Sequence, residues 1–130
     1  MDGNDTEFDL PLPSGRRPRV VWGQLHGAAL GLAIAQAAAR HPSWVCVVVD
    51  SAAAADRLEA DIAFFDPGRR LRRFTDDETL PDDRFAPAQD LIAERLSILH
   101  DLVQEAAPQL LIVDGAALLQ RLPPVDFVRE

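Results

Sequence analysis

The sequence predicts an α/β fold with a mostly parallel sheet and helices on both faces. Two apolar and largely β-branched runs, at residues 44–49 and 110–113, have the composition of strands buried on both faces. Between them, apolar residues recur every three or four positions, which is typical of amphipathic helices. Strands that alternate with helices indicate a parallel sheet joined by right-handed crossovers.

The elements are expected in the order strand, helix, strand, helix, strand, loop, helix, strand, helix. The first strand is predicted at residues 19–22 (RVVW) and the third at 71–74, with a loop at 75–88. Helices are expected at 28–40, from about 51 to 65, after the loop to about 105, and at 116–121. Because Pro11, Pro13, Gly15 and Pro18 interrupt residues 1–18, this segment is predicted to be a flexible tail. Residues 19–130 would form the α/β domain.

The amino-acid composition excludes several classes of protein. The chain has 130 residues, which suits one compact domain, and its apolar fraction of 48% argues against global disorder. A net charge of -8 argues against nonspecific binding of nucleic acid. Its single cysteine, Cys46, cannot form a disulfide within the chain and favours a reducing compartment. With neither a signal core nor an apolar tract long enough to span a bilayer, we expect a cytoplasmic protein and no membrane partner.

The first turn between strand and helix reads WGQLHGAALGLAIA over residues 22–35. In nucleotide-binding folds this turn holds phosphate, and Gly23 and Gly27 could let backbone amides approach it. A working phosphate loop also needs a lysine and a Ser or Thr hydroxyl. Leu30 and Gly31 fall at those positions, and the chain contains no lysine. We therefore favour a structural turn and expect no nucleotide cofactor.

Two expected strands end in aspartate, at Asp50 and Asp114. Such residues can bind magnesium in nucleotide-hydrolysing folds. Without a phosphate-binding lysine, we favour a helix cap for Asp50 and a turn for Asp114.

Charged clusters allow two interpretations each. Four arginines flank Leu71: Arg69, Arg70, Arg72 and Arg73. They predict an exposed edge strand kept soluble by charge, with contact to a phosphate backbone as the alternative. The acidic residues at 76–83 predict a solvated loop, or a site for a cation or an arginine-rich partner. No histidine is spaced with Cys46 as a metal site requires, so we expect neither a metal site nor catalytic residues.

One stretch, DETLPDDRFAPAQDLIAERLSIL at residues 77–99, resembles a motif of the bacterial transcription-repair coupling factor (Mfd) family. The family pattern is W-E-T-L-P-Y-D-x-F-S-P-x-x-D-I-I-x-x-R-L-x-x-L. The matching residues are Glu78, Thr79, Leu80, Pro81, Asp83, Phe85, Pro87, Asp90, Ile92, Arg95, Leu96 and Leu99. Asp77, Asp82 and Ala86 replace the family's Trp, Tyr and Ser. Weaker similarity extends over residues 19–127.

The resemblance implies a fold similar to the first domain of UvrB, which is P-loop NTPase-like but here degenerate. In the family this module precedes a UvrA-binding domain, an RNA polymerase-binding domain and a translocase on double-stranded DNA that uses ATP and magnesium. The chain would then be a non-catalytic N-terminal scaffold fragment, with weak partner binding or none when alone. The motif would be structural. The alternatives are a standalone nucleotide- or phosphate-binding domain and an interaction module that uses the acidic loop.

Overall fold

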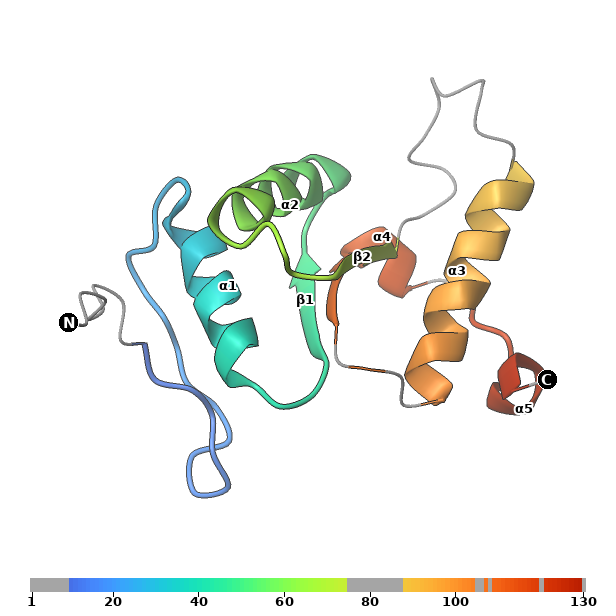
Figure 1. Cartoon of the computed structure of the whole chain (residues 1–130), viewed down its shortest axis with the longest axis horizontal. Coiled ribbons are helices and arrows are strands. Elements are labelled where there is room, and N and C mark those ends of the chain that lie inside the picture. The colour runs from blue at the N-terminus through green and yellow to red at the C-terminus, as the bar shows by residue number, and fades with distance from the viewer. Residues whose placement is uncertain (1–9, 75–87, 105–106, 108, 120, 130) are drawn as a thin grey trace.

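A computed structural model describes residues 10–74, 88–104, 107, 109–119 and 121–129. Figure 1 shows helices and strands alternating along the chain. In order, the elements are α1 (Ala29–Arg40), β1 (Val45–Val49), α2 (Ala52–Phe65), β2 (Leu71–Phe74), α3 (Ala88–Val103), β3 (Leu110–Asp114), α4 (Gly115–Leu118) and α5 (Val125–Arg129).

The strands form a parallel sheet in the order β1-β3-β2. The strand that comes last in the chain, β3, is the central one, and all five of its residues are buried. Leu110 lies opposite both Val45 of β1 and Leu71 of β2, so the three strands begin level with one another. The connection through α2 crosses from β1 past β3 to β2, and α3 leads back to β3.

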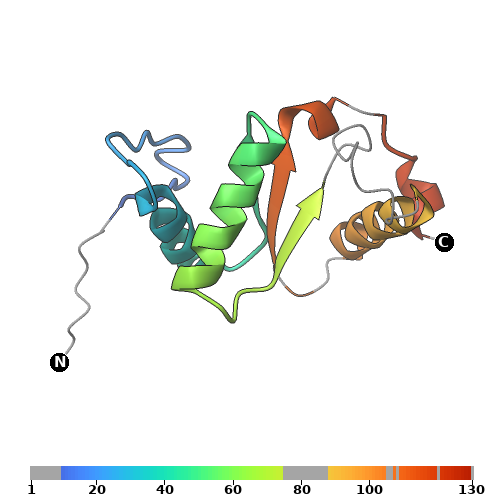
Figure 2. The same ribbon diagram turned by 90° about the horizontal axis from the view of Figure 1, so that it is seen from above.

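Helices cover both faces of the sheet, as predicted (Figure 2). On one face, α1 and α2 pack on β3 through a cluster made by Ile34, Ala35, Ala38, Ala55, Leu58, Ile62, Leu110 and Ile112. On the other face, α3 and α4 meet the sheet through a second cluster made by Phe74, Ile98, Leu111, Val113 and Ala117. The α/β fold class is therefore confirmed.

The strand predicted at residues 19–22 is absent. This segment has no regular secondary structure, and Val21 is 93% exposed. A strand needs a neighbour for its backbone groups, and in the described part of the chain no strand pairs with residues 19–22. The valines alone therefore do not make a strand.

The prediction that β1 is buried on both faces is also wrong. Its residues alternate between half-buried and exposed, and Val48 is 55% exposed. The reason is its position at the edge of the sheet, where α3 packs on β2 and the second core cluster draws on β2 and β3 rather than β1.

The C-terminal region differs in detail from the prediction. The helix expected at 116–121 is the shorter α4, and a further helix, α5, follows Pro123 and Pro124. Proline is favoured at a helix start because its missing N–H needs no partner there. The Pro124 carbonyl accepts from the Val128 N–H at 3.2 Å.

Candidate functional site

The glycine turn, residues 23–27, lies just before α1 and has no regular secondary structure. Gln24 and Gly27 have positive φ angles of 61° and 58°. That conformation favours glycine over residues with a Cβ, so the backbone accounts for Gly27, while Gln24 adopts it with some strain. A Cβ added at Gly23 would meet no atom within 4 Å. Nothing in the structure explains Gly23.

A crevice of about 490 Å³ lies beside the start of α1, next to the glycine turn. Gly27 and Leu30 line it from the α1 side, and Arg57 and Asp61 line it from α2. An anion here would meet one positive and one negative side chain, so their charges offset each other. The crevice thus lacks the positive excess that a phosphate site needs.

Gly31 has a packing role instead. A Cβ added to Gly31 would lie 2.5 Å from the Cβ of Asp61, which is too close for any side chain. The position expected for a magnesium-binding hydroxyl therefore faces α2, and glycine lets the two helices approach. Leu30, at the expected lysine position, is 41% exposed.

The two strand-end aspartates have different roles. Asp114 is 3% exposed, and its Oδ1 accepts from the Ala117 N–H at 2.8 Å, so it caps α4 rather than only forming a turn. Its Oδ2 is buried without a hydrogen-bond partner. The predicted cap role of Asp50 is wrong, because Ser51 caps α2 by accepting from the Ala54 N–H at 3.1 Å.

The arginines of β2 are bound within the fold. On one face, Arg72 donates to Asp101 at 2.7 Å and to Glu94 at 3.2 Å, both on α3. On the other face, Arg73 donates to Asp56 at 2.7 Å and Glu59 at 3.0 Å, both on α2.

These two side chains are only 12% and 18% exposed. Burial lowers the pKa of Arg73, but the hydrogen bonds and charges of Asp56 and Glu59 outweigh it and raise that pKa above its ordinary value. The edge position of β2 was predicted correctly, but Arg72 and Arg73 join elements instead of facing solvent or phosphate.

The motif is described only in part. Residues 75–87, with Glu78, Thr79, Leu80, Pro81, Asp83, Phe85 and Pro87, lie outside the described residues, and so does the side chain of Asp90. The Arg95 guanidinium lies over the ring of Phe74, 4.9 Å from its centre, and Leu96 is half-buried.

The sequence pattern missed the most buried residue of α3. Ile98 is 0% exposed, whereas Ile92, one of the residues that match the family motif, is 50% exposed. Ile98 and Leu102 share a face at a spacing of four, a signal that could have identified it.

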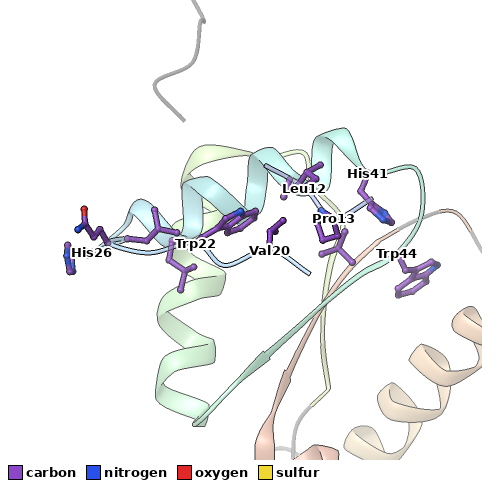
Figure 3. Close-up of a pocket in the computed structure, with 12 residues that line it drawn as sticks. Leu12, Pro13, Val20, Trp22, His26, His41 and Trp44 are labelled. Atoms are coloured by element: carbon purple, nitrogen blue, oxygen red, sulfur yellow. The ribbon is translucent and has the colours of Figure 1, made fainter. Parts of the chain in front are cut away.

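One large cavity was not predicted either. It has a volume of about 700 Å³ and lies between residues 12–26, α1 and the start of β1 (Figure 3). Its wall is mostly apolar, with Val20, Trp22 and Trp44 among its residues. Trp22 Nε1 donates to the Pro11 carbonyl at 2.8 Å. This hydrogen bond links the two irregular segments that form one wall of the cavity.

The described residues contain no group of three or more His, Cys, Asp and Glu placed to hold a metal ion. Partial burial raises the pKa of the Cys46 thiol, although Cys46 is an exposed residue. No described helix has the length and apolar character needed to cross a membrane.

Sequence comparison with known proteins shows which proteins the chain is similar to. The chain is 35% identical over 121 residues, 93% of its length, to the transcription-repair-coupling factor of Escherichia coli (strain K12). It is 36% identical over 126 residues, 91% of its length, to that of Myxococcus xanthus. The chain is related to the transcription-repair-coupling factors.

This relationship confirms the resemblance seen in the motif. A third factor, from Haemophilus influenzae, is 29% identical over 95% of the chain. The match covers only 10 to 11% of each of these relatives, so the chain spans about a tenth of their length. No protein-family model matches the chain.

Proposed function

We propose that the chain acts as a non-catalytic N-terminal scaffold segment of a transcription-repair coupling factor. The observation that carries this proposal is Gly31. In a phosphate loop its position would supply a magnesium ligand, but here it forms the contact of α1 with α2. Together with Leu30 at the lysine position, this suits a turn retained for packing and not for nucleotide hydrolysis.

Calorimetry with ATP and magnesium tests the proposal directly. We expect no binding tighter than about 1 mM, because the crevice has no net positive charge and no lysine. The Arg57→Ala variant is the matched control, since it removes the only cation of the crevice. Micromolar binding that needs magnesium and is lost in Arg57→Ala would contradict the scaffold role and favour a standalone nucleotide-binding domain.

The partners of the full-length factor belong to the same proposal. We expect UvrA, RNA polymerase and double-stranded DNA to bind mainly outside these 130 residues. A pull-down should therefore retain UvrA on a longer protein with about 100 further residues, one more domain, but weakly or not at all on residues 1–130. Equal retention by both proteins would show that a UvrA contact lies within this chain.

A further inference from the structure

The cavity between residues 12–26, α1 and the start of β1 has the size of a small-molecule site. Its volume is about 700 Å³, and pockets of about 300–1,000 Å³ hold ligands of ordinary size. In Figure 3, Val20 and Trp22 reach it from the irregular chain, and the segment 41–44 reaches it from between α1 and β1. The scaffold role proposed above makes no use of this cavity.

Hydrogen bonds hold the irregular side of the cavity in place. At the end of α1, Arg40 donates to the Leu10 carbonyl at 3.1 Å. Trp22 Nε1 donates to the Pro11 carbonyl at 2.8 Å. Between these contacts, two backbone hydrogen bonds of 2.9 and 3.1 Å close a turn at residues 14–17. The wall is therefore formed before any ligand arrives, which lowers the entropy cost of binding.

Two indole rings dominate the apolar surface of the cavity. Trp22 lies on the irregular side, and Trp44 lies just before β1 (Figure 3). The N–H of Trp22 is already bound to a carbonyl, so this ring offers the cavity its carbon surface. Leu12 and Val20 add aliphatic surface. Aromatic molecules gain both burial and favourable ring contacts on such a wall, so the cavity favours a ligand with an aromatic body.

The polar groups of the wall favour a negatively charged ligand. They belong to Gln24, His26 and His41, and no described lining residue is acidic, although the chain has a net charge of -8. The Ser43 N–H donates to His41 Nδ1 at 3.2 Å, which assigns the proton of the neutral ring to Nε2. Nε2 is also protonated in the charged ring. His41 thus offers a donor in both states, and no carboxylate of the wall would repel an anion.

The backbone of Gln24 also indicates a binding site. Its φ of 61° is the only positive φ among the described residues other than glycine. Strained conformations of this kind gather at ligand-binding sites, where the surrounding structure holds them. Gln24 lines the cavity, and its amide provides a further polar group.

We propose that the cavity binds a small aromatic molecule that carries an anionic group. The aromatic body lies against Trp22 and Trp44, and the anionic group accepts a hydrogen bond from His41 Nε2. No reaction is involved, and the scaffold role stands or falls separately, by its own test with ATP.

Two fluorescent probes test this binding. Anilinonaphthalene sulfonate has an aromatic body with an anionic group, and phenylnaphthylamine has the same rings without the sulfonate. The chain has two tryptophans and no tyrosine, and both tryptophans line the cavity, so energy transfer from tryptophan is strongest to a probe bound there. We expect one sulfonate probe per chain, bound several times more tightly than phenylnaphthylamine.

Three variants locate the bound probe. His41→Phe keeps an aromatic ring without the donor, so it should lower the affinity for the sulfonate severalfold and leave that for phenylnaphthylamine unchanged. Ala37→Phe fills the cavity from α1 and should abolish binding of both probes. Ala39→Phe, at an exposed position of the same helix, is the matched control and should bind both as the parent does.

Several results would overturn the proposal. They are no binding of either probe, equal affinity of the parent for both, and sulfonate binding that His41→Phe leaves unchanged. Binding that survives in Ala37→Phe and disappears in Leu119→Glu would place the probe on the exposed side chain of Leu119 instead. If Ala37→Phe shows no unfolding transition in urea, the two affinities of His41→Phe decide the question alone.

Discussion

Gly31 shows how a single missing Cβ sets the distance between two helices. Replacing it with alanine adds a methyl group 2.5 Å from the Asp61 Cβ. Overpacking of this kind costs about 1–3 kcal/mol, while alanine regains about 1 kcal/mol of helix propensity. We therefore expect Gly31→Ala to lower the free energy of unfolding by about 1 kcal/mol in a urea titration, the middle of the difference between these two effects.

Gly23→Ala is the control for that experiment, because the space around Gly23 is open. Its midpoint should match the parent's. A Gly31→Ala protein as stable as the parent would mean that α1 can move from α2 without loss.

Ile98 is the residue of α3 on which packing depends most. It is fully buried among Phe74, Leu111 and Val113. Ile98→Ala should reduce the free energy of unfolding by about 2–5 kcal/mol, through lost burial and the cavity left behind. Ile92→Ala, at a half-exposed position of the same helix, should cost much less. Equal costs for both would place the buried face of α3 elsewhere.

The Cys46 thiol offers a pH-dependent measurement. Because burial raises its pKa, the folded protein holds less thiolate than the unfolded chain at mildly alkaline pH. Alkylation by iodoacetamide should be slower in the folded protein, and its rate should keep rising with pH after that of the urea-unfolded protein has levelled. The associated stability is present below the unfolded pKa and is lost as pH rises through the folded one. Coincident pH profiles would contradict this.

At the scale of elements, β2 is attached to both helix layers by its arginines. Removing Arg72 would leave Asp101 and Glu94 of α3 without their ion-pair partner. We expect Arg72→Met to lower the free energy of unfolding by about 1–2 kcal/mol. The loss is smaller than for a fully buried ion pair because Glu94 is largely exposed. The loss should shrink in high salt. Arg70→Met, at an exposed position before the strand, is the control, and an equal loss there would show a general effect of charge.

Sequence patterns predicted which residues form helices and strands better than they predicted where each element lies in the fold. The runs at β1 and β3 were read as strands because both are apolar and β-branched, and this was correct. The patterns did not distinguish an edge from a centre, since only the sheet order places β3 inside and β1 outside. The strand predicted at residues 19–22 was wrong for the same reason, because a strand forms only where a neighbouring strand pairs with it. Likewise, Gly31 appeared as a remnant of a turn because helix contacts are not visible in local sequence.

At the scale of the whole molecule, apolar side chains remain exposed in the last part of the described chain. Leu119 is 88%, Phe127 60% and Leu118 58% exposed. Contiguous apolar surface favours association, and these side chains are candidates to contribute to it. We expect light scattering to show reversible self-association that weakens in Leu119→Glu. The matched variant Val21→Glu, at an equally exposed residue distant in sequence, should leave association unchanged. A concentration-independent monomer would contradict this.

The order of the strands also governs when the protein can fold during synthesis. β1 and β2 do not touch each other in the sheet, and β3, which joins them, is made last. While the ribosome is still translating the α3 region, the emerging chain contains two strands that lack any sheet partner. Non-local pairing of this kind makes folding slow and leaves apolar strands exposed meanwhile. We therefore expect the sheet to form only after Leu110–Asp114 has left the ribosome, and a chain that ends before Leu110 would leave the other two strands with no sheet to join.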